Sequence, residues 1–222
     1  KNHPTLSFVL FSFYFLFLFS PLSAHAFTPS FGWATPQTLT EWPLEDVKFS
    51  NTTTGWVVGS HGTIFKTTDG GLNWTQKTSS TTAVLYALDF FGTNVWAVGL
   101  GTMVKSTDQG ENWTAFPSAD RFYGVDFVSD TTGFRVGEVT GSGAGVIQKT
   151  TDGGLTWTTQ TAPANTKTLF DIYCTDANNC TAVGRDGVIL LTGNGGTVWI
   201  SRPSGTALIL QDAHFPAVST GY

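Results

Sequence analysis

Three features of the sequence predict an all-β fold, namely a β-propeller of four-stranded antiparallel blades. An eight-residue phrase occurs three times in the 222 residues and a fourth time in altered form. The tryptophans that end the four copies are 39, 44 and 42 residues apart, at Trp74, Trp113, Trp157 and Trp199. Short apolar segments rich in Val, Ile, Phe and Trp precede each copy, as is typical of strands. A period near 40 residues with four short strands per repeat is the pattern of a propeller blade.

Each repeat begins with an apolar segment that we expect to form the first strand of its blade. These segments are 44–49, 85–90, 122–127 and 169–174, and a fifth begins at Leu210. A second marker, Gly55-Trp56-Val57-Val58-Gly59 in the first repeat, predicts the second strand. A third strand is expected at 63–66 and a fourth at 75–78. The predicted blades are 44–84, 85–121, 122–168 and 169–209, followed by a partial one at 210–222.

The repeated phrase lies between the third and fourth strands, where the chain must reverse. Its first copy reads Thr67-Thr68-Asp69-Gly70-Gly71-Leu72-Asn73-Trp74. The aspartate can accept backbone hydrogen bonds, the glycines can take positive φ, and the tryptophan can cover the blade. Equivalent positions in successive blades lie at separate corners of a propeller, so we interpret these residues as structural and not catalytic. The set comprises Asp69, Gly71, Trp74, Asp108, Gly110, Trp113, Asp152, Gly154, Trp157, Asn194, Gly196 and Trp199.

The pattern Ser/Thr-x-Asp-x-Gly-x-Asn/Thr-Trp resembles the Asp-box, or BNR repeat, of sialidases, other glycosidases and non-catalytic propellers. The fuller blade, with Gly-Trp-Val-Val-Gly before Thr-Ile-Phe-Lys-Thr-Thr-Asp-Gly-Gly, resembles the photosystem II stability and assembly factor family and its secreted bacterial relatives. The similarity covers residues 33–222. It implies a protein-binding propeller that helps to assemble or stabilise a membrane-protein complex. The assembly factors carry an arginine-rich surface, whereas this chain has four dispersed arginines. A generic secreted relative therefore stays an equal alternative.

The two ends of the chain give expectations of their own. Residues 1–26 combine a basic start, a 14-residue apolar stretch and Ala24-His25-Ala26, which predicts a secretory signal peptide; an uncleaved anchor is the alternative. Trp33 stands 11 residues before Leu44, so the segment 27–43 is expected to supply a ring-closing outer strand, or else a simple N-terminal tail. Lys1 is not a start methionine and the last blade is incomplete, so we expect a piece of a longer propeller.

Composition fits an exported all-β protein. Only 12% of the residues are charged and the formal net charge is −5, which gives no support for nucleic-acid binding, since that requires a basic face. No other segment is long and apolar enough to cross a membrane. We expect a periplasmic, thylakoid-lumenal or extracellular protein. Cys174 and Cys180 face each other across a predicted hairpin, which favours a disulfide. The competing metal pair lacks further ligands, and no cofactor is expected.

An enzyme is the main functional alternative. The Phe/Tyr-Arg-Ile-Pro motif of sialidases is absent, but another glycosidase could place two carboxylates across the central channel. The first strands would line that channel, and they carry Asp46, Asp89, Asp126, Asp171 and Asp212. These aspartates could equally solvate a pore or cap strand ends. We therefore expect a non-catalytic exported scaffold that binds protein, with an Asp-box glycoside hydrolase or a carbohydrate-binding propeller as alternatives.

Overall fold

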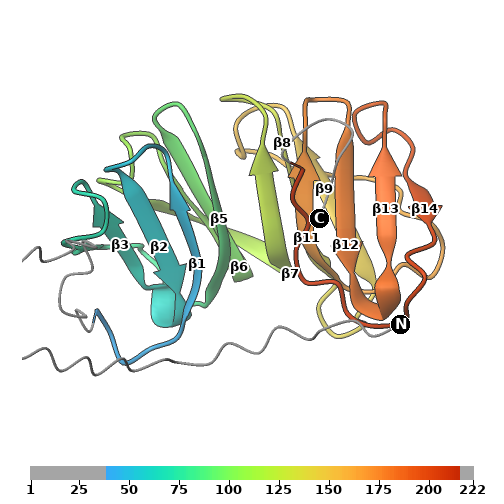
Figure 1. Cartoon of the computed structure of the whole chain (residues 1–222), viewed down its shortest axis with the longest axis horizontal. Coiled ribbons are helices and arrows are strands. Elements are labelled where there is room, and N and C mark those ends of the chain that lie inside the picture. Colours follow the sequence, from blue (N-terminus) through green and yellow to red (C-terminus); the bar gives the residue numbers. More distant parts are fainter. Residues whose placement is uncertain (1–38, 216–222) are drawn as a thin grey trace, which may run out of the picture. The chain divides into compact units, whose positions relative to one another are not determined.

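The computed structural model describes residues 39–215, which contain fourteen strands, two 3₁₀ turns and no α-helix (Figure 1). The first sheet has the order β1-β2-β3-β4 and the last has the order β11-β12-β13-β14, both antiparallel. Their strands are β1 Leu44–Phe49, β2 Gly55–Gly59, β3 Ile64–Thr67, β4 Thr75–Lys77, β11 Leu169–Cys174, β12 Cys180–Gly184, β13 Ile189–Thr192 and β14 Ile200–Arg202. The 3₁₀ turns are Ser60–Gly62 and Arg185–Gly187. The predicted all-β class with four-stranded antiparallel sheets is confirmed.

Several predicted segments lie outside the described residues. These are the signal peptide at 1–26, residues 27–38 of the predicted closing segment, and residues 216–222 of the last predicted blade. Residues 39–43 are described and include no strand. Residues 210–215 run beside the fourth blade without a strand assignment, and Leu210 N–H donates to the Gly184 carbonyl at 3.0 Å.

The two middle blades share one six-stranded sheet of order β10-β9-β8-β7-β6-β5. Its strands are β5 Leu85–Phe91, β6 Asn94–Ser106, β7 Thr114–Phe127, β8 Gly133–Glu138, β9 Gly145–Thr150 and β10 Thr158–Thr159. The first half of β6 pairs with β5 and the second half with β7, so β6 takes the places of β2 and β3. The first half of β7 corresponds to β4, and the second half is the first strand of the third blade. The physical reason for this continuity is the short connection between the two blades. Only 9 residues separate Trp113 from Phe122, the shortest interval between a phrase tryptophan and the next apolar segment, which leaves no room for a loop.

The hydrophobic cores lie between consecutive blades. Trp56, Val58 and Ile64 of the first blade pack against Leu88 and Ala97 of the second. Alternate residues of a strand point to opposite faces, so the neighbours of Ala97 along β6, Trp96 and Val98, pack against the third blade instead. A third cluster joins the third and fourth blades around Phe134, Ile147 and Leu169. Each blade is therefore stabilised mainly by the blades beside it.

A close backbone approach explains the glycine that ends the second-strand marker. In every blade the pairing register of the first strand shifts near its start, between Leu85 and Ala87 in the second blade for example. The marker glycine lies opposite this bulge. A Cβ atom on Gly99 would overlap the carbonyl oxygen of Val84, and one on Gly137 would overlap that of Arg121. Only glycine fits this position without moving the backbone.

Candidate functional site

The Asp-box carboxylates are bound within their own turns. Asp69 Oδ1 accepts hydrogen bonds from Thr67 Oγ1 at 2.8 Å and from the Asn73 N–H at 2.9 Å, and Oδ2 accepts from Asn73 Nδ2 at 2.8 Å. Asp108 and Asp152 repeat this arrangement in the next two blades. Gly71, with φ of 88°, supplies the left-handed turn residue. These local bonds lower the pKa of all three carboxyls, to about 2 for Asp152. Each aspartate thus shapes a turn in a separate blade.

The altered fourth copy forms the same turn with an amide. Asn194 Oδ1 accepts from Thr192 Oγ1 at 3.0 Å and from the Val198 N–H at 2.9 Å. Trp113 and Trp157 donate from Nε1 to the carbonyls of Gly110 and Gly154. Trp199 is buried, but its Nε1 has no acceptor among the described residues. Because the Asn194 amide oxygen takes the place of the aspartate oxygen, a charged carboxylate is not essential to the turn.

The Asp-box turns also hold the preceding blade, which the sequence reasoning missed. Trp96 Nε1 and Lys105 Nζ both donate to the carbonyl of Gly153 in the next blade, at 2.9 and 2.8 Å. Trp56 Nε1 reaches the Gln109 carbonyl, and Lys149 Nζ reaches the Gly195 carbonyl. A signal was available, because Lys66, Lys105 and Lys149 all stand directly before the phrase. The turns are therefore junctions between blades as well as reversals of the chain.

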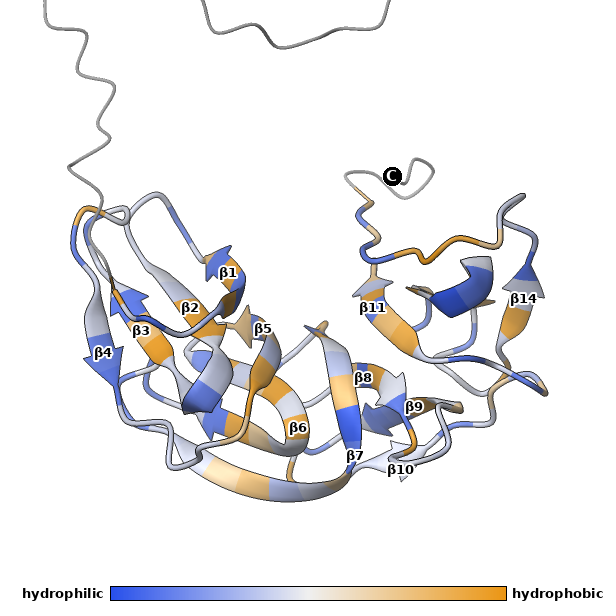
Figure 2. Cartoon of the chain, turned by 90° about the horizontal axis from the view of Figure 1, so that it is seen from below, coloured by the Kyte–Doolittle hydropathy of each residue, from blue (hydrophilic) through white to orange (hydrophobic). Residues whose placement is uncertain are grey.

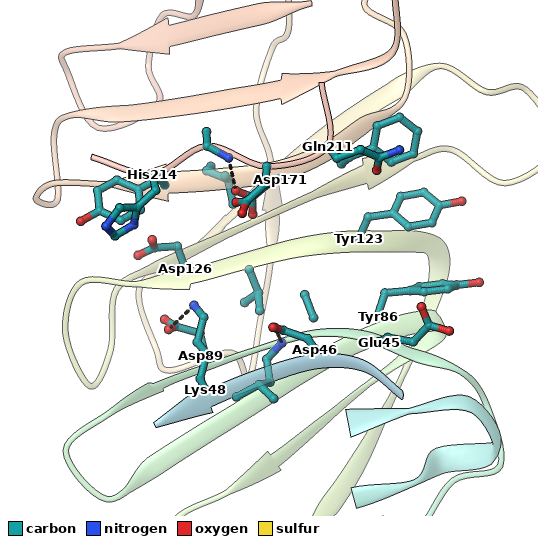
Figure 3. Close-up of a pocket in the computed structure, with 18 of the residues that line it drawn as sticks. Glu45, Asp46, Lys48, Tyr86, Asp89, Tyr123, Asp126, Asp171, Gln211 and His214 are labelled. Carbon is teal, nitrogen blue, oxygen red and sulfur yellow. Dashed lines mark hydrogen bonds and ion pairs between the residues drawn. The ribbon is translucent and has the colours of Figure 1, made fainter. Parts of the chain in front are cut away.

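The first strands surround a cavity of about 670 Å³. In Figure 2, β1, β5 and β11 lie on the inner side, and β4 and β14 lie on the outer side; of β7, the second half lines the cavity. The side chains line the cavity at three levels along these strands (Figure 3). One end carries Glu45, Tyr86, Tyr123 and Gln211; the middle carries Asp46 and Asp171; the other end carries Lys48, Asp89, Asp126 and His214. Three further lining residues contact these: Phe170 lies against Tyr123, Asp212 is hydrogen-bonded to Asp171, and Tyr173 lies against His214. The cavity thus brings together the five aspartates that the sequence placed along the channel.

Three of these aspartates each bridge one junction between successive first strands, and a fourth reaches the segment 210–215. Asp46 accepts the Leu88 N–H at 2.8 Å, and Asp89 accepts the Phe127 N–H at 2.6 Å. Asp126 then accepts the Cys174 N–H at 3.1 Å, and Asp171 accepts the Ala213 N–H at 2.9 Å. An inner strand would otherwise present unpaired donors to the cavity. These carboxylates therefore accept hydrogen bonds from backbone N–H groups along the inner edges. This role is close to the alternative in which the aspartates cap strand ends.

Crowding raises the pKa of the carboxyls within the cavity. Burial raises the pKa of Asp126 to about 7, and the charge of Asp89 adds to the effect. Burial and a hydrogen bond with Asp212 raise the pKa of Asp171 to about 7. Burial also raises the pKa of Asp46. Lys48 partly neutralises the group through an ion pair of 2.9 Å with Asp89. Such carboxyls can exchange protons near neutral pH.

The two cysteines form a disulfide, as predicted. They are direct partners in the register of β11 and β12, with 4.0 Å between their Cα atoms. Both side chains are buried, and Cys174 also lines the cavity. Within residues 39–215 no group of three or more His, Cys, Asp or Glu side chains is arranged to hold a metal ion. In the same range no helix has the length and hydropathy needed to cross a membrane.

Comparison with known proteins places the chain in a family. Residues 26–167, more than half of the chain, match the family described as photosynthesis system II assembly factor YCF48. The chain belongs to this family. No curated protein matches the chain significantly.

Two solved YCF48 structures share the fold. One, "YCF48 bound to D1 peptide", is 22% identical with a TM-score of 0.64, and the match covers 81% of this chain and 59% of that one. YCF48 from Cyanidioschyzon merolae is 23% identical with a TM-score of 0.62, and the match covers 81% of this chain and 62% of that one. The chain thus spans about three fifths of the length of these YCF48 structures. The GH74 enzyme of Niastella koreensis is 19% identical with a TM-score of 0.53, over 70% of this chain and 28% of the enzyme. At these identities the structures show a shared propeller fold and no more.

Proposed function

We propose that this chain is a non-catalytic, exported β-propeller that serves as a protein-binding scaffold in the assembly or stabilisation of photosystem II. The match to the assembly-factor family over residues 26–167 carries the proposal. A related YCF48 has been solved with a D1 peptide. We therefore propose a photosystem II protein, with D1 as the first candidate, as the partner of this chain.

The use of the carboxylates supports a role without catalysis. The Asp-box aspartates are bound inside their turns, and four of the cavity aspartates accept backbone N–H groups of the next blade or, for Asp171, of the segment 210–215. A hydrolase needs one carboxyl as proton donor and a second one free as base or nucleophile, and Asp212 is the one cavity aspartate outside this set of backbone acceptors in the described part of the chain. The buried Cys174–Cys180 disulfide supports export into an oxidising compartment, which we propose to be the thylakoid lumen, the periplasm or the extracellular space.

A pull-down from gently solubilised native membranes tests the proposal. The tagged full chain is expected to retain photosystem II subunits, and a tagged chain unfolded by reduction and heating serves as the control. Recovery of no photosystem II subunit above this control would contradict the scaffold function. The hydrolase alternative predicts release of reducing sugar from a panel of polysaccharides, with loss of activity in Asp126→Asn and Asp171→Asn.

A further inference from the structure

Three aromatic side chains form a row along one end of the cavity. Tyr86, Tyr123 and Phe170 occupy the same position, the second residue, in three successive first strands. The ring centroids of Tyr86 and Tyr123 are 4.9 Å apart, and those of Tyr123 and Phe170 are 5.4 Å apart. All three are half-buried cavity-lining residues and belong to none of the cores between the blades. Their aromatic surface therefore faces the cavity and is available to a ligand.

The same cavity has a strong excess of negative groups. Six carboxylate side chains line it: Glu45, Asp46, Asp89, Asp126, Asp171 and Asp212. Among the described residues, Lys48 is the one lysine or arginine in the lining, and it is paired with Asp89. Arg121 lies next to the aromatic row but is held outside the lining by Glu138 at 3.1 Å and by the Tyr123 hydroxyl at 3.2 Å. The lysine and arginine side chains in this lining therefore do not balance its carboxyl groups, of which Asp126 and Asp171 reduce their own charge through a pKa raised to about 7.

We propose that the cavity binds an arginine-bearing segment of a partner protein, whose side chain stacks on the row of Tyr86, Tyr123 and Phe170 and directs its guanidinium to the carboxylates. A guanidinium stacks on aromatic faces and pairs with carboxylates through two parallel hydrogen bonds. A volume of about 670 Å³ lies within the range of ligand-binding cavities and exceeds one side chain. The inference rests on the scaffold function and names the kind of segment that the scaffold would hold.

The proposed binding should also depend on pH, because the cavity aspartates bind protons. Asp126 faces Asp89, Lys48 and Asp171, and Asp171 faces Asp212; Tyr173 and His214 complete this part of the lining. Because the pKa of Asp126 and of Asp171 is about 7, an incoming cation favours their ionised forms. Binding should then release protons below pH 7, and the affinity should rise between pH 6 and pH 8.

Titration calorimetry with synthetic peptides tests the proposal on the full chain. The probe is a capped ten-residue Gly/Ser peptide with two arginines, and its matched control carries neutral citrulline at both positions. We expect the arginine peptide to bind about tenfold more tightly than the citrulline peptide, and more tightly at pH 8 than at pH 6. Tyr123→Leu, which keeps apolar bulk but removes the ring, should weaken binding about fivefold to tenfold. Asp212→Asn should also weaken it.

Two variants outside the cavity serve as matched controls. Phe91→Ala removes an exposed ring, and Asp186→Asn removes an exposed carboxylate at a left-handed position that asparagine tolerates. Both should bind the arginine peptide as the parent chain does. If Tyr123→Leu does not fold, as judged by near-ultraviolet circular dichroism, Asp212→Asn carries the test alone.

Equal affinity for the two peptides, or an unchanged affinity in Asp212→Asn, would overturn the proposal. Binding of Ca²⁺ alone without binding of the peptide would overturn it as well. These outcomes are separable from the scaffold function: a membrane pull-down that survives Tyr123→Leu and Asp212→Asn would keep the scaffold and reject the cavity as its binding site. If the parent chain itself retained no photosystem II subunit, the scaffold function would be rejected.

Discussion

Asp152 and Asp126 carry the same side chain, and their surroundings move its pKa in opposite directions. Asp152 lies at the surface, where hydrogen bonds from Thr156 and Thr150 favour the charged form and lower its pKa to about 2. Asp126 is enclosed by the inner strands, where burial and the charge of Asp89 favour the neutral form and raise its pKa to about 7. The sequence places both residues in a repeat, but only the fold distinguishes a turn from a cavity.

The first prediction concerns Asp152 and acid stability. Its folded pKa lies below the ordinary value of 3.8, so its contribution to stability is present above about pH 4 and is lost as the pH falls toward 2. Asp152→Ala should destabilise the fold at pH 7, whereas Asp152→Asn should destabilise it less, because Asn194 already forms this turn. Both variants should reduce the proton uptake on unfolding between pH 4 and pH 2 by up to one proton, as measured by urea unfolding at several pH values. A pH profile identical to that of the parent chain would contradict this.

The second prediction concerns the marker glycine of the third blade. Gly137→Ala places a methyl group against the Arg121 carbonyl oxygen, so the backbone must shift, and we expect a loss of about 1–3 kcal/mol in the free energy of unfolding. Gly193→Ala is the matched control, since the nearest atom to its added methyl group, Asn179 Oδ1, would be 3.6 Å away. Equal midpoints of urea denaturation for the two variants would show that the bulge yields easily.

At the scale of the element, the pattern of apolar residues was sufficient to place most strands. The apolar starts at Leu44, Leu85 and Leu169 are the first residues of β1, β5 and β11. The continuity of β6 and β7 was not readable from the pattern, because it depends on pairing between strands that are separate in the sequence. The 9-residue interval between Trp113 and Phe122 was the available clue, but it is informative only when it is compared with the longer intervals between the other tryptophans and the apolar segments that follow them.

The third prediction concerns the hairpin of β11 and β12. The disulfide closes a short loop, so its removal in Cys174→Ala/Cys180→Ala should cost about 2 kcal/mol on the chain-entropy account. Urea unfolding of the parent chain with and without a reductant separates the effect of the cross-link from the loss of the two buried sulfur atoms in the double variant. The double variant should be insensitive to the reductant. A parent chain that is equally stable when reduced would show that hairpin pairing alone holds the two strands.

At the scale of the whole molecule, two sets of hydrogen bonds join consecutive blades, one near the channel and one farther from it. Near the channel the cavity aspartates accept N–H groups of the next first strand, and farther out the tryptophans and lysines donate to the next Asp-box turn. The sequence places the aspartates in the inner strands and the phrase in the turns. It could not show that both sets act between blades, because their partners lie between 38 and 57 residues away in the sequence and the bonds run to backbone atoms, which no residue type reveals.

The fourth prediction addresses this coupling. Asp89→Ala leaves the Phe127 N–H and Lys48 without a partner, which should cost about 2–3 kcal/mol. Because each blade is stabilised by its neighbours, the change should also broaden the urea transition and lower its m-value. Asp89→Asn retains an acceptor for the N–H and should lie between Asp89→Ala and the parent chain. An unchanged midpoint and m-value in Asp89→Ala would contradict a coupling role.

The shared sheet of the two middle blades has a consequence for engineering. Residues 118–121 belong to β7 and carry its pairing from one blade to the next, so a tag or a circularly permuted terminus placed there would split a continuous ribbon. The turn at 140–143 offers the opposite situation: a methyl group added to Gly141 or Gly143 would have no neighbouring atom within 4 Å, and Gly141 is exposed. A reporter domain inserted at Gly141 would leave the aspartate and lysine contacts between blades intact.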